Sequence, residues 1–203
     1  MKALRVGIVD YGVGNLGSIE RTLRSLGYRC SVSSQPNVLV EMDLILLPGV
    51  GAFPAAMHSL NENDLVEFLQ LQARLGRPII GICLGMQLLA DASYEFKYTT
   101  GLGIMPGEVV PLPNSLLHIG WNTLEVLNSE ELLNKSDRQS FYFNHSFVFE
   151  TPCEYQIGLA RLNQPLTVAV RRDNVVGLQF HPEKSQFAGR ALLSSLIEGL
   201  CSA

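Results

Sequence analysis

The sequence predicts an α/β fold: a single-domain, doubly wound and mostly parallel sheet flanked by helices, with additional antiparallel strands in the C-terminal half. Through the first half of the chain, short apolar runs alternate with stretches of helical spacing. After about residue 101, strand-like runs follow one another with turn residues between them and little helix. The length of 203 residues and the apolar fraction of 47% are enough for one sizeable core, so we expect one domain over residues 1–203.

The first half alternates strands and helices. Leu16, Ile19 and Leu23 mark one face of a helix, and Gly27 is a plausible stop for it. A residue run such as 44–47, apolar throughout, is typical of a strand buried on both faces. In order, we expect strands at 4–9, 28–33, 44–47 and 78–82, helices after residue 15, around 54–60, at 65–75 and at 84–90, a break at 35–37 and a glycine-rich loop at 48–53.

The second half reads mostly as strands. Asp173 and Asn174 predict a tight turn between the last two of them, and a final helix runs from about residue 188 to 200. The expected strands are 108–112, 119–127, 141–149, 156–161, 167–171 and 175–180.

Composition excludes several classes of function. A net charge of −4 argues against a nucleic-acid partner, which would need a basic face. No apolar run approaches transmembrane length, and Arg5 and Asp10 leave too short an apolar stretch for a signal peptide, so we expect a cytoplasmic protein without a membrane partner. Free thiols are expected in that compartment. The four histidines are not spaced with one another or with cysteine as in a zinc site, so we predict no metal.

Cys83 lies where the pattern changes from a strand to a helix. Gly81 and Gly85, two positions on either side, remove side chains that would clash in a sharp turn. This is the nucleophile-elbow arrangement with cysteine in place of serine. The N-terminus of the following helix points at the sulfur and favours the thiolate. The alternative is a buried structural cysteine, because cysteine is among the most buried residue types.

A candidate base follows the strand predicted at 175–180. His181 can accept a thiol proton near neutral pH, and Glu183 is close enough in sequence to orient the imidazole. Both Cys83 and His181 follow apolar strands, and the carboxyl ends of parallel strands meet at one edge of a sheet. Beside the elbow, an ordinary core or surface histidine becomes the weaker interpretation of His181.

An oxyanion hole would complete such a site. Attack on a carbonyl develops negative charge on oxygen, which backbone N–H groups stabilise. The elbow offers the N–H of Leu84, and the glycine loop at 48–51 offers others. The loop is equally well explained as a simple turn between a strand and a helix.

Residues 12–17 spell G-x-G-x-x-G after the first strand, which is the fingerprint of a dinucleotide site. Such a site needs an acidic residue about 20 positions further on to hold the ribose hydroxyls. The second strand ends in Ser33 and Ser34, and no Asp or Glu lies between Glu20 and Glu41. We therefore expect no cofactor, although a nucleotide-binding module stays an alternative.

These residues together resemble a known family. Residues 81–87 (GICLGMQ) with 180–183 (FHPE) resemble the triad, or class I, glutamine amidotransferases. Within that family, longer blocks are similar to the glutaminase subunits of imidazole glycerol phosphate synthase. These blocks are 10–16 (DYGVGNL), 47–53 (LPGVGAF), 101–107 (GLGIMPG), 118–122 (HIGWN), 141–146 (FYFNHS) and 181–186 (HPEKSQ), and they cover nearly the whole chain in order.

The resemblance implies an activity and a set of site residues. In the family, the cysteine attacks the side-chain amide of glutamine, the histidine moves the protons and the glutamate orients it. Carried onto this sequence, the triad is Cys83, His181 and Glu183, and the oxyanion and substrate-binding residues are Gly49, Val50, Gly51, Leu84, Gln87, His145, Ser146 and Phe147.

The resemblance also implies a partner. Ammonia passes to a separate (β/α)8 cyclase subunit in a heterodimer, which makes imidazole glycerol phosphate and an aminoimidazole carboxamide ribonucleotide in histidine biosynthesis. The residues toward that partner would be Asn15, Trp121, Tyr142 and Lys184.

The chain departs from the family pattern at Gly17, Leu116, Leu117 and Phe147, which concern the partner face and the rim of the glutamine site. Related subunits supply ammonia for sugar amidation in surface-polysaccharide pathways, so that pathway stays open. A stand-alone cysteine hydrolase acting on γ-glutamyl peptides is a further alternative on the same elbow.

Overall fold

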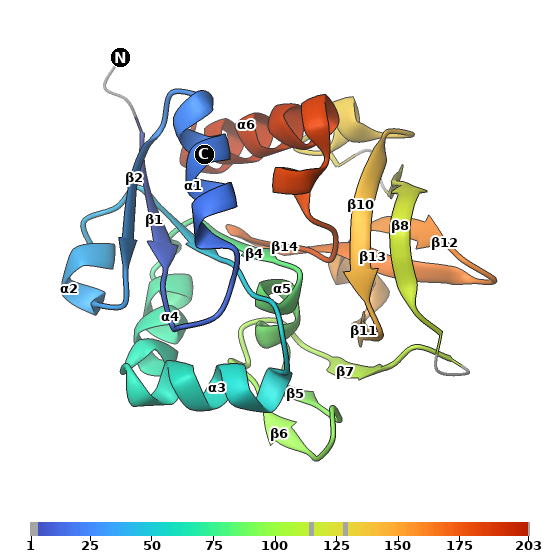
Figure 1. Ribbon diagram of the computed structural model, residues 1–203, viewed down its shortest axis with the longest axis horizontal. Helices are drawn as coiled ribbons and strands as arrows, with labels where there is room; N and C mark the ends of the chain where they lie inside the picture. Colours follow the sequence, from blue (N-terminus) through green and yellow to red (C-terminus); the bar gives the residue numbers. More distant parts are fainter. Residues whose placement is uncertain (1–3, 114–115, 128–129, 203) are drawn as a thin grey trace.

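The structure is a computed structural model in which residues 4–113, 116–127 and 130–202 are described (Figure 1). The helices are α1 (Leu16–Ser25), α2 (Pro36–Leu39), α3 (Phe53–Glu62), α4 (Leu65–Arg74), α5 (Leu84–Leu88) and α6 (Gln186–Ser202), with short 3-10 helices η2 (Asn134–Ser136), η3 (Cys153–Tyr155) and η4 (Pro182–Lys184). The strands are β1 (Arg5–Val9), β2 (Arg29–Ser33), β3 (Leu44–Leu47), β4 (Ile79–Ile82), β5 (Ala92–Ser93), β6 (Thr99–Thr100), β7 (Glu108–Pro111), β8 (His118–Thr123), β9 (Glu125–Val126), β10 (Ser140–His145), β11 (Phe147–Glu150), β12 (Gln156–Arg161), β13 (Pro165–Arg172) and β14 (Val175–Leu178).

The central sheet confirms the predicted α/β class. Its eight strands run in the order β2-β1-β3-β4-β14-β13-β12-β9. The strands from β2 to β14 pair in parallel, and β13, β12 and β9 continue the sheet in antiparallel pairing. Parallel pairs need helical crossovers, and these come from the first half of the chain, whereas the antiparallel pairs need only short turns. The turn predicted at Asp173 and Asn174 joins β13 to β14.

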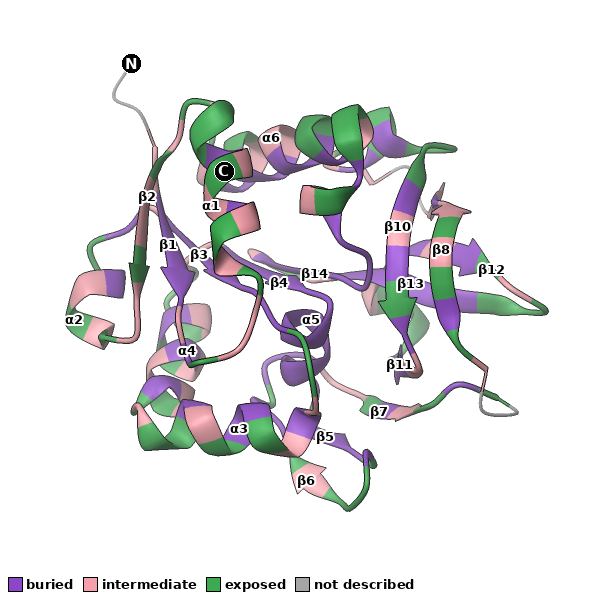
Figure 2. Ribbon diagram, viewed as in Figure 1, coloured by how far each residue is buried: buried purple, intermediate pink, exposed green. Residues whose placement is uncertain are grey.

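Helices cover both faces of this sheet, as expected for a doubly wound fold. Alternate side chains of β1 and β3 point to opposite faces, because the period of a strand is two. Val6 and Leu44 pack with α1 and α6 on one face, and Ile45 and Leu47 pack with α3, α4 and α5 on the other. The parallel strands β3, β4 and β14 are buried throughout (Figure 2).

The strand predicted at 141–149 is in fact two strands. β10 pairs with β8, whereas β11 pairs with β7 in a different sheet, and the chain bends between them at Ser146. Asn144, His145 and Ser146 interrupt the apolar run at the bend, but the sequence does not show which strands the two halves pair with. This break matters for the site, because it turns the backbone of residues 144–147 toward the carboxyl end of β4.

The structure also corrects one other predicted strand and one predicted break. The strand predicted at 119–127 divides into β8 and β9 around the buried Leu124, since β8 pairs with β10 and β9 pairs with β12. The break predicted at 35–37 holds the start of α2, where Pro36 occupies the first helical turn, a position that proline tolerates. The short strands β5 and β6 were not predicted at all.

The fold brings the predicted functional segments to one edge. β1, β3, β4 and β14 are parallel neighbours, so their carboxyl ends lie together. The segments that follow them are the loop with Tyr11, the loop at 48–51, the elbow at Cys83 and the turn at His181. In the described part of the chain, no helix combines the length and apolar character needed to cross a membrane.

Candidate active site

Cys83 occupies a strained turn at the end of β4. Its φ of 55° and ψ of −112° are unusual for a residue with a side chain. Its N–H donates to the carbonyl of Leu178 at 2.7 Å, which ties the elbow to β14. A Cβ on Gly85 would lie 1.8 Å from the carbonyl oxygen of Leu47, and one on Gly81 would lie 2.6 Å from that of Gly85. Only glycine fits at both positions, as the motif predicted.

His181 and Glu183 form a buried pair beside the elbow. The Nδ1 of His181 lies 2.8 Å from Oε1 of Glu183, and the two side chains are 4% and 1% exposed. With Nδ1 held, Nε2 is the ring nitrogen that can exchange a proton with Cys83. The second oxygen of Glu183 is buried and has no hydrogen-bond partner among the described residues. A positively charged imidazole is therefore the group that compensates this carboxylate.

The charge state of His181 follows from these neighbours. Burial lowers the pKa of its imidazole, but Cys83 and Glu183 raise it, and the net effect brings the pKa from its usual 6.5 to about 9. Because the pKa is raised on folding, the protonated imidazole stabilises the folded protein below about pH 6.5, and this contribution is lost as the pH rises through about 9.

We expect the His181 imidazole to titrate near pH 9 in an NMR titration of the folded protein. Cys83→Ala removes a group that raises this pKa, so the midpoint should move to lower pH. A midpoint for His181 that is the same with and without the Cys83 sulfur would contradict the proposed coupling.

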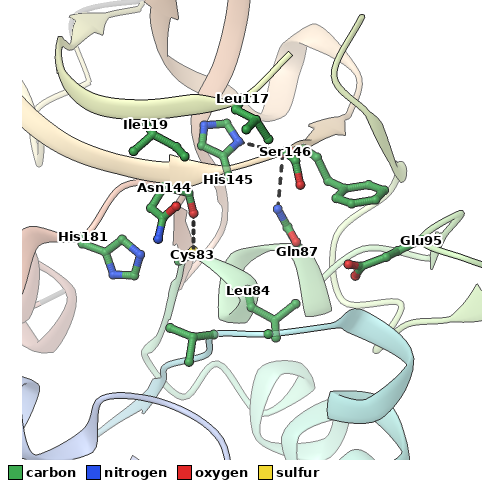
Figure 3. A pocket seen from close by; sticks show the side chains of 13 residues that line it. Cys83, Leu84, Gln87, Glu95, Leu117, Ile119, Asn144, His145, Ser146 and His181 are labelled. Carbon is green, nitrogen blue, oxygen red and sulfur yellow. Dashed lines mark hydrogen bonds between the residues drawn. The ribbon is translucent and has the colours of Figure 1, made fainter. Parts of the chain in front are cut away.

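A pocket of about 190 Å³ opens above Cys83 (Figure 3). Its volume is slightly larger than that of an engineered cavity of about 150 Å³ that binds benzene, so it suits a small molecule. Of the predicted substrate and oxyanion residues, those lining it with Cys83 and His181 are Val50, Gly51, Leu84, Gln87, His145, Ser146 and Phe147.

Gly49 lies beneath the pocket and not in its wall. A Cβ at Gly49 would approach the hydroxyl of Tyr11 to 2.5 Å and the Cβ of Leu84 to 2.9 Å. The same hydroxyl donates to the carbonyl of Pro48 at 2.7 Å, so Tyr11 fixes the start of the glycine loop. Burial, and then the nearby Cys83, raise the pKa of Tyr11, which keeps it a neutral donor. Tyr11 was not among the predicted site residues.

Three other polar residues were missed from the sequence: Gln179, Glu95 and Asn144, the last of which lines the pocket. Gln179 accepts from the Nε2 of Gln87 at 2.9 Å, and its own Nε2 lies 3.8 Å from the sulfur of Cys83. A glutamine at the end of an apolar strand was the only available signal. Glu95 lines the far end of the pocket, where its carboxylate accepts the N–H of Phe53 at 2.6 Å. It sits in a segment without periodic pattern, so nothing in the sequence marked it.

The predicted partner residues fall into two places. Trp121 and Tyr142 are paired across β8 and β10, with ring centroids 6.2 Å apart, and the Nζ of Lys184 lies 5.8 Å from the Tyr142 ring. The Tyr142 ring in turn lies 6.5 Å from that of His181. Asn15 instead precedes α1, where its carbonyl accepts the backbone N–H groups at the start of that helix. Among the described residues, no group of three or more His, Cys, Asp or Glu side chains could hold a metal ion.

A comparison with known families identifies the family of the chain. The family described as glutamine amidotransferase class-I matches residues 7–195. The chain belongs to the class-I glutamine amidotransferase family. Proteins named imidazole glycerol phosphate synthase subunit HisH are 43% identical in Lacticaseibacillus casei and in Carboxydothermus hydrogenoformans, and the alignments cover 94% of this chain and 94% of the first protein, and 95% and 98% for the second.

Solved structures share the fold. The structure of PurLQS from Thermotoga maritima matches with a TM-score of 0.79 at 20% identity, covering 98% of this chain and 100% of that one. A glutamine amidotransferase from the same organism matches with a TM-score of 0.75 at 18% identity and covers all of both chains. At such identities, the likeness supports the class-I fold and nothing finer.

Proposed function

We propose that this class-I amidotransferase hydrolyses glutamine to glutamate and ammonia through Cys83, His181 and Glu183. The observation that carries the proposal is one pocket containing a cysteine at a strained elbow and an imidazole held at Nδ1 by a buried carboxylate. Nucleophile, base and orienting group in that relation are the requirements for covalent acyl transfer.

The proposed chemistry has two halves. The Cys83 thiolate attacks the amide carbon of glutamine, and the His181 imidazolium gives its proton to the nitrogen, so ammonia leaves and a thioester forms. Water then attacks the thioester while His181 takes its proton, which releases glutamate and restores the thiolate. Glu183 keeps Nδ1 occupied, so that Nε2 serves both steps.

The oxyanion would form between the elbow and the glycine loop. Leu84 is the first residue of α5, and the first N–H groups of a helix have no partner within it. Val50 and Gly51 line the same pocket as Leu84, and Gly51 has a φ of 100°, which permits a turn of its peptide that other residues rarely adopt. We propose the N–H groups of Leu84 and of this loop as the donors.

Glu95 is the group that would select an α-amino acid. It is a buried carboxylate in the pocket wall, and a carboxylate there favours the ammonium group of glutamine. Gln87 and the backbone of residues 144–147 line the space between Glu95 and Cys83 (Figure 3).

Glu95→Gln is expected to raise the KM for glutamine by about 10- to 100-fold with a much smaller change in kcat, because it removes a charged hydrogen bond made in ground state and transition state alike. The amide oxygen that the substitution introduces at position 95 can still accept the N–H of Phe53, so the fold should survive. Steady-state glutamate release measures both constants. As a binding readout, glutamine should slow alkylation of Cys83 less in the variant, with the exposed Cys153 as the unprotected reference. Unchanged KM and unchanged protection would remove Glu95 from the site.

We further propose that ammonia passes to a (β/α)8 cyclase subunit in a heterodimer and serves histidine biosynthesis. The relatives above are named as subunits of imidazole glycerol phosphate synthase, which favours this pathway over sugar amidation. Trp121, Tyr142 and Lys184 form the cluster beside His181 that would meet this partner, and Asn15 would contribute from the β1–α1 loop. The deciding test is glutamine-dependent turnover of the synthase substrate by the co-purified pair, against the same assay with a sugar-modifying partner.

Lys184→Glu is expected to weaken binding of the cyclase subunit by about tenfold or more, because reversing a charge at an interface turns an attraction into a repulsion. Titration calorimetry of the purified subunits measures the effect. Lys97→Glu reverses another exposed lysine, in the β5–β6 connection, and should leave the affinity unchanged. Equal affinities for both variants would place the partner elsewhere.

The whole chain, residues 1–203, is proposed to act as one glutamine amidotransferase domain without a cofactor. Its four cysteines are free, which fits a cytoplasmic location.

A further inference from the structure

Three side chains and one carbonyl form a continuous hydrogen-bonded row between β8 and the pocket. Nδ2 of Asn122 lies 3.0 Å from Nε2 of His118, and Nδ1 of His118 lies 2.9 Å from Nε2 of His145. Nδ1 of His145 lies 2.7 Å from the carbonyl oxygen of Phe147, which belongs to the pocket wall. Both imidazoles are buried, and His118 is stacked on the Phe143 ring with centroids 4.1 Å apart.

The row admits one assignment of protons. A carbonyl only accepts, so His145 must donate from Nδ1 and, when neutral, must accept at Nε2. His118 must then donate from Nδ1 and accept at Nε2, and the partner there is the amide N–H of Asn122. The second N–H of that amide donates to the carbonyl of Arg161, and its oxygen accepts the N–H of Thr123. Every polar atom of the row is therefore used in one direction.

Both histidines are neutral at ordinary pH. Burial lowers the pKa of His118 to about 4. Burial also lowers that of His145 to about 4, with His118 and His181 acting in the same sense against the hydrogen bond to Phe147. Neutral rings are what the assignment requires, since a second proton on either ring would face a donor.

The end of the row reaches the nucleophile. The Phe147 carbonyl also lies 3.4 Å from Nε2 of Gln87, which donates its other proton to Gln179, and Gln179 in turn contacts the sulfur of Cys83. The Asn144 carbonyl, on the same turn of backbone, lies 4.0 Å from that sulfur. The position of residues 144–147 therefore affects the groups around the Cys83 sulfur.

We propose that Asn122, His118 and His145 are positioning residues of fixed polarity, which hold the Phe147 carbonyl and the 144–147 backbone in the form that binds glutamine. The inference rests on the proposed function for its ligand, but the row itself is a property of the folded protein. Two imidazoles buried without partners would be costly, and an apolar pair could fill the same space. The two imidazoles instead form hydrogen bonds that all run in one direction and end on a carbonyl of the pocket wall. This arrangement points to a role in orienting that wall.

The proton positions are tested first, on the wild-type protein. In 15N NMR spectra of the imidazole rings, His118 and His145 should each carry a proton on Nδ1 and none on Nε2 at pH 7. A proton on Nε2 of either ring would overturn the proposal. This measurement needs no activity, so it stays decisive even if the chain proves not to be a glutaminase.

Asn122→Asp then tests the role. The carboxylate keeps the shape of the amide but accepts where the amide donated, so it draws a proton onto Nε2 of His118 and reverses the local polarity. We expect the KM for glutamine to rise about five- to tenfold, with kcat changed by less than about threefold, as for loss of one oriented hydrogen bond in binding. The His118 pKa should rise in the same variant.

Asn174→Asp is the matched control. Its amide also donates to a backbone carbonyl, that of Gly76, but it lies at the opposite end of β14 from the pocket. It should lose comparable stability without a change in KM. If both variants shift KM equally, or if a folded Asn122→Asp protein binds glutamine as the wild type does, the row serves stability alone and the proposal fails.

Discussion

Replacing Cys83 by alanine is expected to lower the rate of glutamate release from glutamine by about 10⁴- to 10⁶-fold, the order of magnitude of the losses measured when one member of a catalytic triad is removed. Among the described residues that line the pocket, Cys83 carries the sulfur that we propose to form the acyl intermediate, at the end of β4 and beside His181. Without it, the pocket can still bind the amide and polarise it, so a small residual rate is consistent with the mechanism.

The control for this experiment is Cys153→Ala, which removes an exposed thiol in η3. It should keep full activity. The Cys83 variant should also bind glutamine, which calorimetry can measure, because the glutamine contacts proposed above do not involve the sulfur. Steady-state assays are run with the proposed cyclase subunit present, so that a missing partner does not limit the rate. Retention of more than about a tenth of the wild-type rate by Cys83→Ala would exclude the thioester mechanism.

The elbow and the neighbouring His181–Glu183 pair could be predicted because their signals are local. The spacing of apolar residues changes from strand to helix at Cys83, and glycines stand at 81 and 85. This pattern predicts a tight turn that only small residues permit. His181 follows a second apolar strand, and the rule that parallel strands end at one edge brings the two together. Because β4 and β14 are directly paired, Cys83 and His181 follow neighbouring strands, which the rule by itself did not require.

What the sequence could not show depends on which strands pair. Polar residues 144–146 interrupt the apolar run of residues 141–149, but they do not show that the pairing partner changes from β8 to β7, which depends on how the sheets assemble. The same holds for the row from Asn122 to His145, whose members are joined by cross-strand register: His145 pairs with His118. Glu95 reaches the pocket from a short connection between β5 and β6, where no period predicts direction.

Gly85→Ala is expected to destabilise the protein by about 3 kcal/mol or more, a loss typical of severe overpacking against backbone. The added Cβ would lie 1.8 Å from the Leu47 carbonyl oxygen and 3.3 Å from the carbonyl carbon of Pro48. Neither atom belongs to a flexible side chain, so β3 and α5 must move apart. Urea unfolding followed by circular dichroism measures the change, and failure to obtain folded protein is the extreme form of the same result.

Gly17→Ala is the matched substitution in α1. Its Cβ would meet nothing closer than the Arg21 guanidinium at 3.7 Å, so alanine should be neutral or stabilise by up to about 1 kcal/mol through its helix propensity. If Gly85→Ala unfolds at the same urea concentration as Gly17→Ala, the close packing of the elbow against β3 is wrong. The Leu47 carbonyl packs against Gly85 and directly precedes the loop that carries Val50 and Gly51. Any folded Gly85→Ala protein should therefore also lose glutaminase activity. Moving β3 away from α5 to relieve the clash also moves the proposed oxyanion donors away from the Cys83 sulfur. Stability and catalysis therefore both depend on the absence of a side chain at Gly85.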